Sequence, residues 1–270
     1  MKYETIRVRV DGPIGRLTLC RPDRLNALGA TMMREIRKAA GWFDEQQDVR
    51  VVVVAGEGRA FSAGADLKDS PVAGAVPQDG GASWAARREV GQIGLRMADA
   101  VEQMRAVTIA QVKGYAVGGG LVLMAACDLR IVAEDAVFSI PEVDLGIPLA
   151  WGGIPRLVRE IGPALTKELV MTCRRFTPAE AKAAGFVNRV VPAEELEEQV
   201  AGLASELAAK PTVPVIITKE HVNAVTRSMG AGLTAFADGD VLLGTVFDRD
   251  SLAAASRYVE RSLGKGSKGD

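Results

Sequence analysis

The sequence predicts an α/β fold with a mostly parallel sheet, followed by a helical C-terminal third. Over the first two-thirds of the chain, short apolar runs of strand length alternate with segments in which apolar residues recur at helical spacing. From Gly152 onward the pattern is mostly helical. The chain has 270 residues, of which 48% are hydrophobic, so it can bury a sizeable core.

Composition narrows the classes of function. The formal net charge is −1 and the sequence pI is about 6.0, so nothing indicates nucleic acid or a membrane surface as a partner. The longest apolar runs are shorter than the roughly 20 residues of a membrane-spanning helix. The polar N-terminus, residues 1–7, is unlike a signal peptide. We therefore expect a cytoplasmic protein.

The cysteine and histidine content limits the possible chemistry. Cys20, Cys127 and Cys173 lie far apart in apolar segments and are expected to be reduced core residues. The single histidine, His221, has no metal-ligand spacing around it. A histidine-based triad and a metal site are therefore not expected. Catalysis would have to use carboxylates, backbone amides or a bound cofactor.

The N-terminal elements follow in order. Residues 6–10 alternate strictly and residues 14–20 form a second apolar run, and the turn residues 11–13 between them indicate a hairpin. A loop then leads into a helix whose apolar residues recur at helical spacing from Leu28 to Phe43. The continuous apolar run 51–55 is typical of a buried parallel strand.

A segment rich in small residues, 58–67, follows this strand. Asp66 near its end is interpreted, on its own, as a helix cap rather than a catalyst. Residues 69–83 are rich in Gly, Pro, Ala and Asp without periodicity, and they are expected to form a mobile loop. A helix with a Val, Ile and Met stripe between Val90 and Met104 comes next.

The centre of the chain combines a strand, a glycine turn and a helix. The apolar run 107–112 predicts a buried strand, Gly118–Gly120 a turn, and the apolar run 121–126 a helix. Backbone N–H groups at such a helix N-terminus can hold a negatively charged oxygen. A tight turn that only allows close packing is the alternative. The spacing matches neither a Rossmann nor a P-loop phosphate site.

Two acids then lie among apolar residues. After predicted strands at 129–133 and 136–140, the irregular segment 141–148 contains Glu142 and Asp144. Acids in an apolar context are costly unless they are paired or functional. The alternative is that one is a cap and the other a surface acid, and both interpretations stay open from the residues alone.

The remaining chain predicts helices and one short strand. Thr177–Glu180 has the signature of a capped helix with proline at its first position. Further helices are expected to begin near Pro163 and Pro214, and the strand lies at 186–191. The last helices are expected at 196–207, 233–247 and 250–263, and the tail 264–270 is expected to be disordered.

Several segments together resemble the crotonase family, also called the enoyl-CoA hydratase/isomerase superfamily, over nearly the whole chain. The most specific are Ala60–Leu67, Gly114–Gly120 with Cys127-Asp128, Ile140-Pro141-Glu142 with Leu145-Gly146, and Thr177–Val187. The resemblance implies a crotonase-like spiral of ββα units. It implies a core at residues 1–195 that forms an acyl-CoA site, and a helical trimerisation region at residues 196–270.

The resemblance also implies roles for residues at matching positions. The thioester oxygen is expected between the amides of Ala65 and Gly119, with CoA near the loop 24–27. Coenzyme A is then part of the substrate, no separate cofactor is expected, and the assembly is a homotrimer or a hexamer built as a dimer of trimers. The positions implied to bind substrate or CoA are Arg24, Ala27, Ala63, Asp66, Leu67, Tyr115, Gly118, Val122, Pro141 and Leu145.

One departure from the family pattern predicts the reaction. Hydratases of the family use two glutamates, of which one matches Glu142 and the other falls at Val122. A chain with one base resembles the family's monofunctional isomerases, which shift a 3-enoyl-CoA to a 2-enoyl-CoA. The extra acids of dienoyl-CoA isomerases would fall at Val122 and near Ala150. The alternatives are a hydratase that uses Asp144 or another acid, and a non-catalytic acyl-CoA binding protein.

Overall fold

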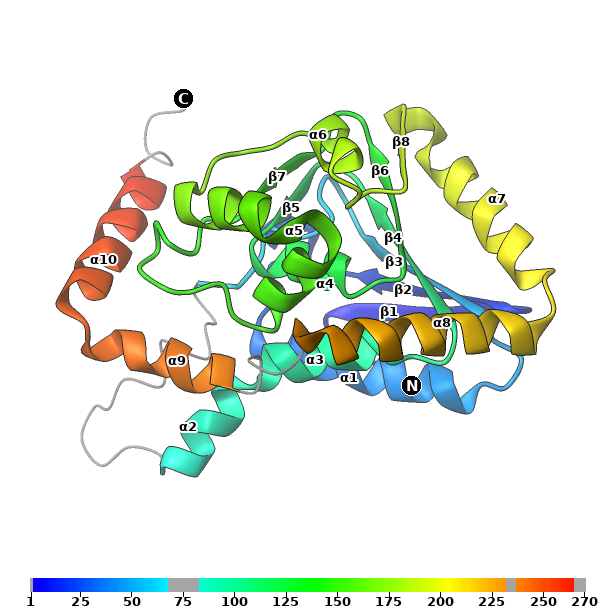
Figure 1. Cartoon of the computed structure of the whole chain (residues 1–270), viewed down its shortest axis with the longest axis horizontal. Helices are drawn as coiled ribbons and strands as arrows, with labels where there is room; N and C mark the ends of the chain where they lie inside the picture. Colours follow the sequence, from blue (N-terminus) through cyan, green and yellow to red (C-terminus); the bar gives the residue numbers. More distant parts are fainter. Residues whose placement is uncertain (1, 68–82, 232–236, 265–270) are drawn as a thin grey trace.

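A six-stranded sheet forms the centre of the molecule in the computed structural model, which describes residues 2–67, 83–231 and 237–264 (Figure 1). The strands lie in the order β1-β2-β3-β4-β6-β8. β1 pairs antiparallel with β2, and the other neighbours are parallel. The predicted hairpin and the mostly parallel α/β sheet are thus confirmed. The strand bounds are β1 Ile6–Asp11, β2 Ile14–Leu19, β3 Val51–Gly56, β4 Val107–Val112, β6 Leu129–Ala133 and β8 Arg189–Val191.

Both faces of the sheet are covered by helices. Alternate residues of β3 point to opposite faces, so Val52 and Val54 join one apolar core while Val51 and Val53 join another. The first core lies beneath α1 (Ala30–Glu45), α3 (Ile93–Glu102), α4 (Gly119–Ala125) and α5 (Gly153–Thr172). The second is closed by α7 (Leu196–Ala208), which lies on the other side of the strands (Figure 1). This two-sided burial explains why β3 is apolar throughout.

A second, small sheet carries the glycine turn. β5 (Tyr115–Val117) pairs in parallel with β7 (Val137–Ser139), and α4 follows β5 directly. Only Gly118 is in the turn, with φ 49°, whereas Gly119 and Gly120 are the first residues of the helix. This differs from the predicted three-glycine turn. At Gly120 a Cβ atom would come within 2.6 Å of the Ser62 carbonyl oxygen, so close packing of the helix start explains that glycine.

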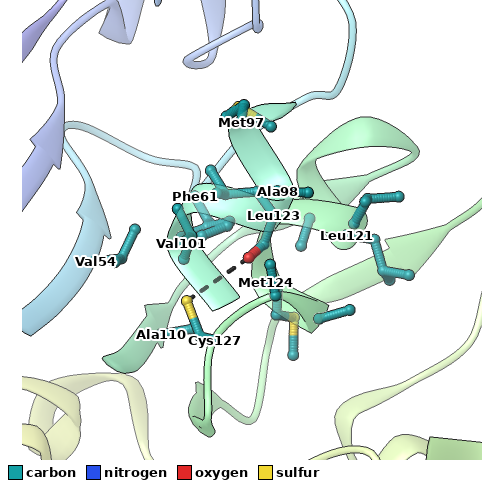
Figure 2. Packing of buried hydrophobic residues seen from close by; sticks show 14 of the residues in the cluster. Val54, Phe61, Met97, Ala98, Val101, Ala110, Leu121, Leu123, Met124 and Cys127 are labelled. Carbon is teal, nitrogen blue, oxygen red and sulfur yellow. Dashed lines mark hydrogen bonds between the residues drawn. The ribbon is translucent and has the colours of Figure 1, made fainter. Parts of the chain in front are cut away.

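Buried side chains fix α4 in place. Figure 2 shows Leu121, Leu123 and Met124 of this helix among Phe61 and residues of α3. At the end of α4 the Cys127 thiol lies 3.6 Å from the Leu123 carbonyl oxygen, drawn as a dashed line. A helix held on so many sides presents its N-terminus in a constant position.

Several helices differ in their bounds from expectation. The predicted helix around 90–104 is broken at Gln92 into α2 (Trp84–Gly91) and α3. The helix expected to begin at Pro163 is the second half of α5, which bends at Gly162 where φ is 75° and ψ is 167°. α6 (Pro178–Ala183) begins as predicted, because the Thr177 side chain accepts a hydrogen bond from the Glu180 N–H at 3.2 Å.

The C-terminal third wraps around the molecule. After α7 the chain continues through α8 (Thr212–Thr226) to α9 (Asp238–Gly244) and α10 (Arg249–Gly264), which lie on the opposite side from α7 (Figure 1). α9 packs closely on α2, because the backbones of Gly239 and Gly91 touch. Short 3-10 turns lie at Pro22–Arg24, Ala193–Glu195 and Thr245–Phe247, and a π-helical turn at Arg227–Ala231.

Some expectations fall outside the described residues. The loop expected at 69–83 and the tail at 264–270 lie almost wholly there, and so does any helix that Asp66 would cap. Within the described ranges, no single helix is long and apolar enough to cross a membrane. One pair of helices, Ala193–Ala208 and Thr212–Met229, bent by 107°, passes that test of length and composition when taken together.

Candidate active site

A cavity of about 320 Å³ opens at the N-terminus of α4. Its walls come from the loop after β3, the start of α4, the segment after β7 and the C-terminal helices α9 and α10. Most of the residues implied by the resemblance line it: Ala63, Ala65, Leu67, Gly118, Gly119, Val122, Pro141, Glu142 and Leu145. The structure therefore brings together segments that lie far apart in the sequence, from Ala63 to Val259 of α10.

The backbone on either side of Ala65 pairs with Leu28, and this pairing turns the Ala65 N–H away from Leu28. Leu28 N–H donates to the Gly64 oxygen at 2.7 Å, and Asp66 N–H donates to the Leu28 oxygen at 3.2 Å. In a parallel bridge of this kind, the N–H of the intervening residue points to the opposite side. No acceptor among the described residues takes the Ala65 N–H. Since Ala65 lines the cavity, this amide is a candidate donor to a ligand.

The start of α4 supplies a second amide beside the first. Gly119 is the first helical residue, so its N–H has no acceptor within the helix, and none is found among the other described residues. A Cβ atom on Gly64 would lie only 3.4 Å from the Gly119 nitrogen. The loop at 63–65 and the helix N-terminus are thus in contact. The partial positive charge of the helix end adds to the attraction for an anionic oxygen.

The carboxyl group of Glu142 lies against Gly118, the residue before the Gly119 amide. A Cβ atom on Gly118 would overlap Oε1 and come within 3.1 Å of the carboxyl carbon of Glu142. Glu142 is 9% exposed, and its Oε2 atom has no hydrogen-bond partner among the described residues. Burial raises the pKa of Glu142 to about 7 from the usual 4.5. A carboxyl group with this pKa is half ionised near neutral pH and can both accept and return a proton.

Glu142 is the one carboxyl group among the described residues that line the cavity. Val122 and Ala150 occupy positions on the wall where related enzymes were expected to carry acids, and both are buried. Asp144, the acid considered as a substitute, is exposed and does not line the cavity. Within the described ranges, no group of three or more His, Cys, Asp or Glu side chains is placed to hold a metal ion.

Four of the residues implied to bind substrate or CoA lie outside the cavity wall. Tyr115 and Arg24 are exposed, and Ala27 is half-buried. The loop at 24–27 nevertheless reaches the cavity rim, because Ala63 N–H donates to the Leu25 oxygen at 2.9 Å. Its backbone is shaped for this approach, since φ is 48° at Leu25 and 55° at Asn26.

The fourth, Asp66, has a structural partner that the sequence did not indicate. Its carboxylate lies 2.8 Å from a guanidinium nitrogen of Arg21, with 6% of the Asp66 side chain exposed. Arg21 also donates to the Ala27 oxygen at 2.9 Å. The ion pair therefore connects the loop at 24–27 with the loop that carries the Ala65 amide.

Aromatic side chains that the sequence did not single out complete the cavity. Trp151 lines it from the segment before α5, and Tyr258 lines it from α10. Glu142, Asp144 and Cys173 all add to the effect of burial in raising the pKa of Tyr258. The predicted boundary at residue 195 thus separates segments that both contribute to one cavity.

Comparisons with known proteins agree on the class. A family model described as enoyl-CoA hydratase/isomerase matches residues 10–263. A probable enoyl-CoA hydratase of Mycobacterium bovis is 38% identical over 237 residues, which are 86% of this chain and 87% of that protein. A peroxisomal Δ(3,5)-Δ(2,4)-dienoyl-CoA isomerase of Arabidopsis thaliana is 36% identical over 221 residues, 80% of this chain and 79% of that one.

Solved structures show the same architecture. The crystal structure of an enoyl-CoA hydratase/isomerase from Mycobacterium paratuberculosis superposes with a TM-score of 0.84 at 26% identity, over 95% of this chain and 100% of that chain. The crotonase-like fold expected from the motifs is therefore confirmed. The chain belongs to the enoyl-CoA hydratase/isomerase family, and it is an enzyme of that family.

Proposed function

We propose that this enzyme is an enoyl-CoA isomerase that moves the double bond of a 3-enoyl-CoA to the 2-position. The observation that carries the proposal is the acid inventory of the cavity. Among the described residues on its wall, Glu142 is the one carboxyl group, and Val122 stands where a hydratase of the family would place a second. A valine side chain can neither accept a proton nor orient a water molecule.

The geometry supports a reaction with one base. The thioester oxygen accepts hydrogen bonds from the amides of Ala65 and Gly119, and Glu142 takes a proton from C2. The negative charge spreads over the thioester oxygen, C2 and C4, and the two amides stabilise it; one such donor lowers a barrier by roughly 3 kcal/mol. The same carboxyl group then delivers the proton to C4. The double bond moves from C3–C4 to C2–C3, and no water is consumed.

The names of the relatives favour two other reactions. The relative from Arabidopsis thaliana is named a dienoyl-CoA isomerase, but in this chain the positions where such enzymes would carry extra acids are Val122 and Ala150. The relative from Mycobacterium bovis is named a hydratase. Hydration is therefore the second candidate, and it requires an acid other than Asp144, which is outside the cavity wall.

Parallel assays of 3-enoyl-CoA and 2-enoyl-CoA substrates of several chain lengths test the proposal. We expect isomerisation of the 3-enoyl-CoA and little formation of 3-hydroxyacyl-CoA from the 2-enoyl-CoA. Efficient hydration would contradict the single-base mechanism. If neither substrate reacts although thioesters bind tightly, the chain is an acyl-CoA binding protein. Full activity in the absence of any added metal or organic cofactor is also expected, with coenzyme A entering only as part of the substrate.

We also propose that the enzyme works as a trimer or a dimer of trimers. No residue of α8 is buried in the single chain, and this helix exposes Val213, Ile217, Val222 and Val225. A helix that exposes this many apolar side chains is normally covered in the assembled protein. Sedimentation should give the mass of three or six chains, and a stable monomer at micromolar concentration would contradict this proposal.

A further inference from the structure

The wall of the cavity next to Gly119 is an indole ring, and we propose that Trp151 is a positioning residue that holds the Gly119 amide in place for enolate stabilisation. The inference rests on the proposed function, because it assumes that the Gly119 N–H donates to the thioester oxygen. It concerns a residue that neither accepts a proton nor donates a hydrogen bond in the reaction. Its role follows from its backbone conformation, its packing and its anchoring.

The backbone of Trp151 is held in a conformation that bulky residues rarely adopt. Its φ is 60°, and the following Gly152 has φ 72°. A large side chain in this left-handed region is strained, and it persists only where the surroundings hold it. The conformation directs the ring inward, so that Trp151 is only 9% exposed and lines the cavity.

The indole fills the space between two glycines on different helices. A methyl group at Gly94 of α3 would overlap the five-membered ring at Cγ, Cδ2 and Cε2. A methyl group at Gly119 of α4 would overlap Cζ3 and lie 2.8 Å from Cε3 of the six-membered ring. The ring therefore packs against the Cα atoms of both helices. The start of α3 and the start of α4 therefore cannot move toward each other without a clash with the indole ring.

A buried arginine anchors the turn from inside. Nη1 of Arg156 donates to the carbonyl oxygens of Trp151 at 3.3 Å and Gly152 at 3.2 Å. Nη2 of the same side chain is hydrogen-bonded to Asp99 at 2.8 Å and to Glu102, both on α3. Because Arg156 is 4% exposed, water competes little with these bonds.

A carboxylate of α9 anchors the same turn from the other side. Oδ2 of Asp238 accepts a hydrogen bond from the Gly152 N–H at 2.7 Å. The turn is thus fixed to α3 through Arg156 and to α9 through Asp238. An anchor at both sides of one strained residue is what a precisely placed ring requires, because an oxyanion donor must keep its position to within a fraction of an ångström.

Gly94→Ala tests the inference from a site outside the reaction. The added methyl group pushes the indole toward Gly119, although alanine is otherwise the better helix residue. The readout is the exchange of the C2 protons of hexanoyl-CoA for deuterium, followed by mass spectrometry, together with the Kd of hexanoyl-CoA. We expect the exchange rate of the bound complex to fall by about 10- to 100-fold while Kd changes less than about threefold.

A double-mutant cycle shows whether the effect passes through the ring. Trp151→Ala alone should lower exchange, and adding Gly94→Ala to it should lower exchange no further, because the methyl group then meets an empty space. Gly202→Ala is the matched control, since a Cβ atom at this helical glycine of α7 has no neighbour within 4 Å. It should leave exchange unchanged. Additive effects in the cycle would overturn the inference.

Trp151→Phe keeps the experiment decisive if the alanine variant does not fold. Phenylalanine retains an aromatic ring, but its smaller side chain lacks the outer part of the indole, around Cζ3, that reaches Gly119. Exchange should therefore fall while acyl-CoA binding is kept. Wild-type exchange in a folded Trp151→Phe enzyme, or a change in Kd alone, would show that the ring only shapes the acyl cavity.

These outcomes separate the inference from the proposed function. A wild-type enzyme that exchanges C2 protons but hydrates 2-enoyl-CoA would contradict the isomerase assignment. The double-mutant cycle would then still test the role of Trp151. A wild-type enzyme that neither exchanges the C2 protons of hexanoyl-CoA nor isomerises a 3-enoyl-CoA would contradict both.

Discussion

Two buried glutamates in this enzyme have similar exposure and opposite acidity. Glu142 in the cavity is 9% exposed and Glu102 on α3 is 7% exposed. Burial raises the pKa of Glu142 to about 7. Burial also acts to raise the pKa of Glu102, but the guanidinium groups of Arg156 and Arg159 outweigh it and hold that pKa below its usual value. The difference between the two sites is the presence of charged partners.

The comparison separates the proposed site of proton transfer from a cluster of buried ion pairs. Glu102 is bonded to Arg156 and, at 2.9 Å, to Arg159, and Arg159 is in turn 3.0 Å from Glu160. Such a paired carboxylate has no tendency to accept a proton near neutral pH. Glu142 has an oxygen without a partner among the described residues, which weakens the fold but leaves the carboxyl group free to react.

Removing the reactive carboxyl group should have the largest effect. Glu142→Gln keeps the size of the side chain and removes the proton acceptor, so isomerisation should fall by about three orders of magnitude. Binding of a saturated acyl-CoA should change little, because in the proposed site backbone amides and the loop at 24–27 bind the thioester and CoA. Side-by-side measurement of kcat and Kd checks this. Full isomerase activity in the variant would show that Glu142 is structural.

The same substitution should stabilise the protein at higher pH. A carboxyl group whose pKa is raised in the folded state favours folding fully below its unfolded pKa of about 4.5, and this contribution is lost as the pH rises through about 7. Glu142→Gln should therefore match wild type near pH 4 and exceed it above pH 7 by about 3 kcal/mol. Urea unfolding at a series of pH values measures the difference, and a pH-independent difference would contradict the raised pKa.

Glu102→Gln should change the stability near neutral pH in the opposite direction. The depressed pKa of Glu102 adds stability above its unfolded pKa, and that stability is lost as the pH falls through the folded value. The variant should lose about 2 kcal/mol at pH 7, less than for a fully broken buried pair, because Asp99 and Glu160 still neutralise the two arginines. Urea unfolding at pH 7 tests this, and a more stable variant would show that the cluster is dispensable.

The smallest effect is expected where a second acid is introduced. Val122→Glu places a second carboxyl group on the wall of the cavity that holds Glu142, so hydration of 2-enoyl-CoA should become detectable at a low rate. The new negative charge should also move the midpoint of the pH–rate profile for isomerisation above the value near 7 that the raised pKa of Glu142 leads us to expect for the wild type. An unchanged midpoint in a folded variant would mean that the two carboxyl groups do not interact.

Local patterns in the sequence predicted much of the fold. The strand at 51–55 and the capped helix at Thr177 depend on burial and on a short-range hydrogen bond, and both are confirmed. The break at Gln92 and the bend that joins the two halves of α5 at Gly162 were not predicted. Both depend on how a helix meets its neighbours in space, which the periodicity of one segment does not contain.

The site was predictable to the extent that it consists of motifs. Gly118 and Gly119 at the start of α4 and the acid Glu142 could be found from the sequence, and the structure places them on the wall of one cavity. Trp151 could not, because its importance lies in a positive φ and in contacts with Gly94 and Gly119 on other elements. A single tryptophan within an apolar segment has the same sequence pattern as any core residue.

The proposed oxyanion donors are main-chain groups, and this affects how enzymes of this kind can diverge. At Ala65, proline is the one natural substitution that removes the N–H group. A change at Glu142, by contrast, removes the base at once. Descendants of such a chain can therefore gain or lose acids at positions such as Val122 and Ala150, and so change the reaction, while inheriting the same anion-binding centre. Gly119 cannot be replaced in this way, because the Trp151 ring leaves no space for a side chain at that position.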